Sequence, residues 1–176
     1  MKKVLKHKLL FLLILTTMLL VLSLGTNQIL KHYNVVEQKE LTAPANWYED
    51  YTYELDETNH TITLKKYNGS ASELVVPSSA VIDGVTYNTI IEGRASSSTL
   101  LFSNHTNLTK ITFENGIKAK GSLAYMFYNC KNLETIIFND FDTTNVTSME
   151  GLFYSCLKLK NVDITMLNTA NVNNFK

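Results

Sequence analysis

The sequence has few of the residues that mark disordered or disulfide-stapled chains. Its 176 residues include only 2 prolines, 7 glycines and 2 cysteines, whereas 45% are hydrophobic. This composition excludes collagen-like, low-complexity and disulfide-scaffold proteins, and no Cys/His spacing is typical of a zinc site. The chain is therefore expected to fold around a hydrophobic core, with neither metal nor cofactor. About 150 residues, enough for one domain, follow the first 26.

Positive charge is scarce outside the N-terminus. The formal net charge is zero, but four lysines lie within the first eight residues. After Gln28 there are 12 basic and 16 acidic residues, a net charge of −4. A nucleic-acid-binding protein needs basic residues to neutralise phosphates, so nucleic acid is not an expected partner.

The basic start precedes an uncharged apolar segment of 16 residues, Leu9–Leu24. A helix of that length spans about 24 Å, less than the ~30 Å hydrocarbon core of a bilayer. Residues 1–26 are therefore predicted to be a signal peptide, with Ser23 and Gly25 before the cleavage site. The alternative is an uncleaved membrane anchor extending to Leu30, which would be the only contact with the membrane. Both place the remainder extracellularly or at the cell surface.

Residues 27–48 are polar and are predicted to be a spacer, with a short helix near Tyr33–Leu41. Residues 49–100 are predicted to be a β-rich N-terminal capping module. The expected elements are a hairpin over Tyr51–Tyr67, strands at Leu74–Val76 and Thr86–Ile91 with a tight turn at Ile82–Val85 between them, and a loop at Gly93–Thr99.

The most informative feature is an internal repeat. Met126–Met149 recurs 26 residues later as Leu152–Phe175, and a degenerate copy begins at Asn104, 25 residues before Asn129. A period of 25–26 lies within the range of leucine-rich repeats, and the spacing L-x-x-I-x-F from Leu133 is typical of their strand. Each unit is expected to contain one strand and a short helical or turn-rich return.

One such unit cannot bury its own apolar face, so neighbouring units must stack. We therefore predict an α+β repeat protein: a short leucine-rich-repeat solenoid of about three units over residues 101–176, the first degenerate, behind the β-rich cap. No cap is visible at the C-terminal end, where the last unit is expected to fray unless the array is longer.

The blocks FDTTNVTSMEGLFYSCLKL and YMFYNCKNL resemble the BspA-like leucine-rich-repeat surface proteins of bacteria, whose units carry F-D-T-x-x-V-x-x-M-x-x-[ML]-F-x-x-C-x-x-L. The matching residues are Phe141, Asp142, Thr143, Val146, Met149, Leu152, Phe153, Cys156 and Leu159. The resemblance implies an exported, non-enzymatic protein that acts in adhesion or binds an extracellular host or matrix protein. The alternatives are a truncated fragment of a larger surface protein and a secreted hydrolase with an unrecognised site.

Candidate chemistry is sparse. Cys130 and Cys156 occupy equivalent repeat positions and are expected to be buried thiols, with a disulfide as the alternative. His105 has no catalytic motif around it, and Asp140 and Asp142 are expected to be turn residues. No catalytic residue is predicted.

A binding surface is the remaining candidate. Residues between the apolar positions of each repeat strand should point outward on the concave sheet. They are Lys110, Thr112, Glu114, Thr135, Ile137, Asn139, Asn161, Asp163 and Thr165. Ile137 is the one large apolar side chain among them, and a partner is expected to dock around it.

Overall fold

The computed structural model describes residues 41–93 and 101–175, which form a 3-10 helix and ten strands. The helix is η1 (Trp47–Asp50). The strands are β1 (Tyr51–Asp56), β2 (Thr61–Tyr67), β3 (Glu73–Val76), β4 (Ser79–Ile82), β5 (Val85–Gly93), β6 (Lys110–Phe113), β7 (Lys118–Ser122), β8 (Thr135–Phe138), β9 (Asp142–Ser148) and β10 (Asn161–Val162). The predicted signal peptide lies outside the described residues. The predicted helix also lies outside them except for Leu41, and so does the predicted loop except for Gly93.

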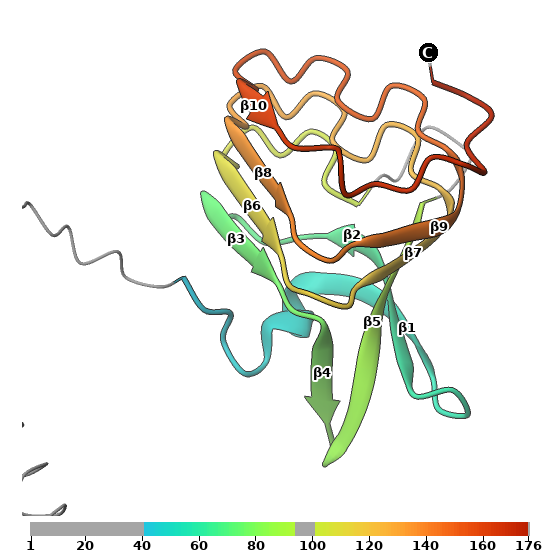
Figure 1. Ribbon diagram of the computed structural model, residues 1–176. Helices are drawn as coiled ribbons and strands as arrows, with labels where there is room; N and C mark the ends of the chain where they lie inside the picture. The colour runs from blue at the N-terminus through green and yellow to red at the C-terminus, as the bar shows by residue number, and fades with distance from the viewer. Residues whose placement is uncertain (1–40, 94–100, 176) are drawn as a thin grey trace, which may run out of the picture. The chain divides into compact units, whose positions relative to one another are not determined.

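One of two sheets contains the predicted repeat strands. This repeat sheet has the order β10-β8-β6-β3, and its strands lie side by side and parallel (Figure 1). Ile136 of β8 is paired with Ile111 of β6 and with Val162 of β10, which are 25 and 26 residues away in sequence. Ile136 and Phe138 are buried, as are Ile111 and Phe113. The predicted period and strand position are therefore confirmed.

The second sheet has the order β1-β2-β5-β7-β9, with β4 paired to β5. The predicted hairpin is present, since β1 and β2 pair antiparallel from Tyr51↔Tyr67 to Asp56↔Thr61. The tight turn before β5 is also present, with Asp83 and Gly84 at φ 52° and 80°, as a two-residue hairpin loop requires. Strands β4, β7 and β9 were not predicted. Two of them, β7 and β9, give the first and second repeats a second strand where a helix or turn was expected.

The returns between β7 and β8, and between β9 and β10, contain turns and no helix. Successive turns are closed by bonds such as Tyr128 N to Tyr125 O at 2.8 Å and Cys130 N to Phe127 O at 3.2 Å. Asn129 has a φ of 60°, in the left-handed region, which ends any growing α-helix. The prediction of an α+β fold is therefore wrong: the described residues form a leucine-rich-repeat-like β-solenoid of about three turns. Each turn of the solenoid is called a coil below: the first coil is 101–122, the second is 123–148 and the third is 149–175.

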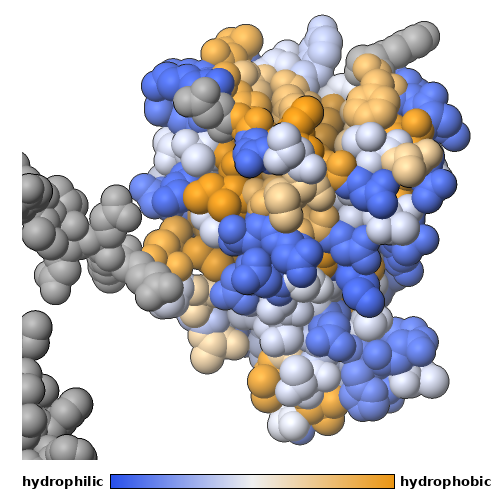
Figure 2. Space-filling model, viewed as in Figure 1, coloured by the Kyte–Doolittle hydropathy of each residue, from blue (hydrophilic) through white to orange (hydrophobic). Residues whose placement is uncertain are grey.

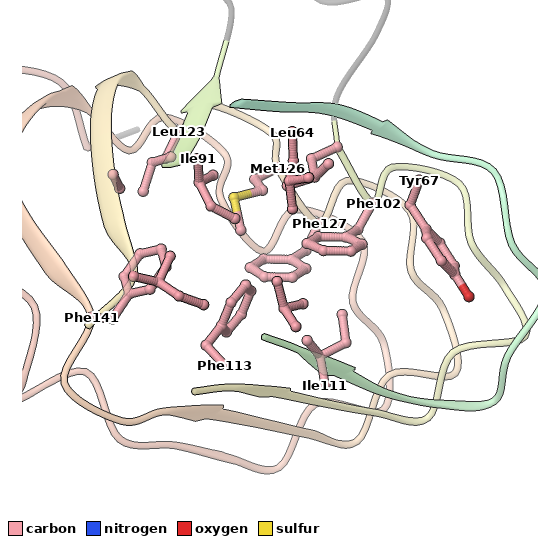
Figure 3. Packing of buried hydrophobic residues seen from close by; sticks show 14 of the residues in the cluster. Leu64, Tyr67, Ile91, Phe102, Ile111, Phe113, Leu123, Met126, Phe127 and Phe141 are labelled. Atoms are coloured by element: carbon pink, nitrogen blue, oxygen red, sulfur yellow. The ribbon is translucent and has the colours of Figure 1, made fainter. Parts of the chain in front are cut away.

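Aromatic rings stack from coil to coil in the core (Figure 3). Phe102 lies over Phe127 with ring centroids 5.6 Å apart, and Phe127 over Phe153 at 5.8 Å. Phe113 lies over Phe138 at 5.4 Å. The same ring contact thus recurs between neighbouring coils, and the repeated phenylalanines contribute to the core.

The N-terminal β-rich segment is continuous with the repeats. It supplies β3 at the edge of the repeat sheet, and β5 pairs in parallel with β7 of the first coil. Trp47 contacts Tyr51 (ring centroids 5.5 Å apart), Tyr51 contacts Tyr67 (5.0 Å), and Tyr67 contacts Phe102 (6.0 Å). T-shaped and tilted ring contacts therefore connect the aromatic core of the repeats to the N-terminal helix.

Candidate binding surface

The predicted surface residues on strands lie in two rows across the repeat sheet. Pairing places Glu73, Lys110, Thr135 and the backbone of Asn161 in one row. It places Val75, Thr112 and Ile137 in the next. We call the side chains of Lys110, Thr112, Thr135 and Ile137 the outer face. Ile137 is exposed to 37%, whereas the other three are half-buried.

The remaining predicted residues lie beyond the strand ends, where they bond to neighbouring backbone or turns. The Glu114 carboxylate accepts from Ser78 N at 3.1 Å, and Asn139 Nδ2 donates to Phe113 O at 2.7 Å. Asp163 Oδ1 accepts hydrogen bonds from the Thr165 hydroxyl at 2.5 Å and from Thr165 N at 2.9 Å, and these two bonds lower the pKa of Asp163. All four side chains are exposed, so they border the outer face.

The two cysteines are free thiols in equivalent surroundings. Cys130 Sγ donates to Phe102 O at 2.9 Å, and Cys156 Sγ donates to Phe127 O at 3.1 Å. Burial raises the pKa of Cys130 to about 12, and it raises the pKa of Cys156 as well. The thiolate that nucleophilic chemistry needs is therefore disfavoured. Instead, each repeated cysteine bonds a carbonyl of the preceding coil.

The other candidate side chains have structural partners too. His105 Nε2 lies 2.9 Å from Tyr67 O, and burial lowers the pKa of this imidazole. Asp142 Oδ1 accepts from Thr144 N at 3.0 Å, a contact that lowers the pKa of the carboxyl group. Within residues 41–93 and 101–175, no three His, Cys, Asp or Glu side chains form a group that could hold a metal ion. The described part of the chain also contains no helix suited to spanning a bilayer.

A second feature, at the C-terminal end of the solenoid, was not located from the sequence. An apolar cavity of about 370 Å³ is lined by the third coil, including Leu152, Phe153, Ile164, Leu167 and Phe175.

The repeat segment has a recognisable family signature. Residues 99–176 match the family described as "Mycoplasma protein of unknown function, DUF285". No curated protein matches the sequence.

Two solved structures are similar to this chain. The leucine-rich-repeat protein of T. pallidum has 16% identity and a TM-score of 0.49, covering 77% of this chain and 64% of that one. A leucine-rich cell surface protein of Faecalibacterium prausnitzii has 21% identity and a TM-score of 0.36, covering 70% and 42%. This chain thus spans less than two thirds of either protein. The fold assigned to this chain rests on the strand pairing described above.

Proposed function

We propose that this chain is a non-enzymatic repeat protein of surface type that binds an extracellular protein through its outer face. The observation that carries the proposal is the register of the repeat sheet, which places Lys110 beside Thr135 and Thr112 beside Ile137. Paired strands hold these four side chains in fixed positions. Repeat arrays use such sheet surfaces to bind extended partners.

The chemistry of the outer face suits a protein partner. Ile137 offers an apolar contact, Lys110 a positive charge, and the two threonines hydroxyl groups that donate and accept. Glu114 and Asp163 add negative charge at the border. An apolar centre with a polar rim is the usual anatomy of a protein interface. A non-enzymatic role is supported by the raised pKa values of both thiols and by the hydrogen bond of His105 to Tyr67 O.

Export and surface location belong to the same proposal. The apolar N-terminal segment supplies either a cleaved signal or an anchor, and the spacer 27–48 separates it from the solenoid. The β-rich segment acts as the N-terminal cap of the repeats, because Tyr51 and Tyr67 cover the ring of Phe102.

Binding to a panel of purified extracellular matrix proteins tests the role of the outer face. Ile137→Asp and Lys110→Glu should each weaken binding at least tenfold, since both changes alter side chains at the centre of the face. The matched control is Val81→Asp, because Val81 is 58% exposed but lies on β4 of the other sheet. Binding that survives both changes, or that Val81→Asp weakens equally, would contradict the proposal.

A further inference from the structure

Strand β4 has one edge that no other strand covers. Within the described residues β4 pairs only with β5, in an antiparallel register that sets Val81 opposite Thr86. Thr89 N donates to Ser78 O at 2.8 Å, so Ser78 and every second residue after it bond across the hairpin. Val81 does not belong to that set. Its N–H and C=O groups therefore point away from β5, toward the open edge.

The main-chain groups on this edge are only partly used. Ser79 also faces away from β5, and its carbonyl oxygen accepts a hydrogen bond from Trp47 Nε1 at 3.2 Å. The N–H and C=O groups of Val81 have no hydrogen-bond partner in the part of the chain that the structure describes. Its side chain is 58% exposed. One residue thus offers both a donor and an acceptor, which is the pair of groups that an added strand bonds.

A groove of about 330 Å³ includes this residue in its lining. The lining consists of the segment 42–45, Trp47, Pro77, Ser79, Val81 and Glu114. Most of these side chains are apolar, and Glu114 adds a carboxylate. The β4–β5 hairpin projects at the bottom of the view in Figure 1, and Figure 2 shows hydrophobic side chains on the same part of the surface. We call the groove and the open edge of β4 together the β4 groove.

The charges at the β4 groove have one sign. Glu114 Oε2 accepts from Ser78 N at 3.1 Å, and among the described residues no lysine, arginine or histidine forms an ion pair with this carboxylate. Residues 41–50 and 77–85, which supply most of the lining, contain no lysine or arginine. The same two segments contain three acidic residues, which are Glu49, Asp50 and Asp83. The β4 groove therefore favours a positively charged segment over an acidic one.

The same charges disfavour a second copy of this chain. Two β4 edges paired with each other would bring the acidic residues of both copies together, and like charges across paired strands are destabilising. We propose that the β4 groove binds a basic extended segment of a different protein, which adds a strand to β4 and places a lysine or arginine beside Glu114. None of the four outer-face side chains lines the groove, so this inference stands or falls independently of the proposed function.

The probe is the fluorescein-labelled peptide Thr-Val-Lys-Val-Lys-Val-Thr, whose β-branched residues favour an extended chain. Fluorescence anisotropy with the full chain should show saturable binding that weakens when salt is added, because salt screens the charges. A peptide with Glu in place of both Lys should bind at least tenfold more weakly. A peptide methylated at every main-chain nitrogen keeps both charges but cannot donate to β4, and it should also bind at least tenfold more weakly.

Variants of the full chain locate the peptide. Val81→Pro removes the free N–H and no bond to β5, since proline is tolerated where a strand N–H faces solvent, and it should weaken binding at least threefold. The matched control is Thr86→Pro, which should leave binding unchanged because the Thr86 N–H faces the opposite edge of the hairpin. Glu114→Gln removes the charge but keeps an oxygen for Ser78 N, and it should also weaken binding at least threefold. Its control, Glu73→Gln, alters an exposed carboxylate on β3 and should have no effect.

Four results would overturn the proposal. They are the absence of saturable binding, equal binding of the Glu-substituted peptide, equal effects of Val81→Pro and Thr86→Pro, and loss of binding through Ile137→Asp, which would assign the peptide to the outer face. A dimer of the chain alone that Val81→Pro dissociates would also overturn it, because the occupant would then be a second copy.

Discussion

The two ends of the solenoid differ although the coils between them repeat. At the N-terminal end, Tyr67 donates its N–H to Leu101 O, and the rings of Tyr51 and Tyr67 cover Phe102. At the other end of the described segment, the last stacked rings are those of Phe153 and Tyr154. Among the described residues, the main-chain N–H groups of Gly151, Phe153 and Ser155 have no main-chain acceptor. In a repeat protein, each coil is stabilised by its own contacts and by its neighbours. Equivalent residues should therefore differ in their contribution to stability.

The largest expected effect separates Phe127 from its equivalent, Phe153. Phe127 is fully buried between Phe102 and Phe153, so Phe127→Ala should lower the free energy of unfolding by about 3–5 kcal/mol. Phe153 has one stacked neighbour and is half-buried, so Phe153→Ala should cost about 1–2 kcal/mol, below that range because its site is open on one side. Urea unfolding followed by circular dichroism measures both. Equal losses would contradict the difference between the ends.

The next effect concerns pH and the fully buried thiol. The folded-state pKa of Cys130, about 12, lies above its ordinary value of 9.0, so the folded state retains the proton longer than the unfolded chain. This contribution to stability is complete below pH 9 and is lost as the pH rises toward 12. Between pH 8 and pH 10.5, the free energy of unfolding should fall by about 2 kcal/mol through this thiol.

Urea unfolding at pH 8 and pH 10.5 measures that loss in the parent chain and in Cys130→Ala. The variant should lose less stability over the interval, although Cys156 and the buried Tyr51 have raised pKa values and leave a remainder of the same sign. Cys156→Ala is the matched control and should flatten the profile less, because Cys156 is only half-buried. An identical pH dependence in the parent and Cys130→Ala would refute this assignment.

The smallest expected effect concerns the aromatic cluster of the N-terminal segment. Tyr51 is 5% exposed, and its hydroxyl has no hydrogen-bond partner among the described residues. Tyr51→Phe removes this unsatisfied group and should raise the free energy of unfolding by about 0.5–1 kcal/mol. Tyr67→Phe is the control, because the Tyr67 hydroxyl accepts from Ala71 N at 3.2 Å, and its loss should destabilise by a similar amount. Thermal unfolding of both variants should show a raised Tm for Tyr51→Phe and a lowered Tm for Tyr67→Phe.

The sequence predicted the elements whose apolar residues follow a clear period. The repeat strands were found because Leu133, Ile136 and Phe138 have the spacing of a leucine-rich strand, and β1 and β2 because they alternate. Strand β9 was missed because its buried residues include Thr143, whose hydroxyl donates to Asn168 O at 2.9 Å. Strand β7 was missed because it buries little beyond Ala119.

The helical alternative for the returns was wrong for a physical reason. Residues such as Asn104 and Asn129 adopt a left-handed backbone, and the N–H groups around them bond to the next coil. Propensities along a single unit do not contain this information, because it depends on how neighbouring coils align. The outer face followed from strand alternation, because alternate residues of a strand point to opposite faces of the sheet.

Amide hydrogen exchange of the full chain, resolved by NMR, tests the asymmetry of the solenoid most directly. We expect slow exchange at Tyr125, Phe127 and Asn129, whose N–H groups bond to the third coil, and exchange at least a hundredfold faster at Gly151, Phe153 and Ser155. Equal exchange rates at these two sets of amides would contradict the proposed difference between the second and third coils, because the N–H groups of both coils would then be equally protected.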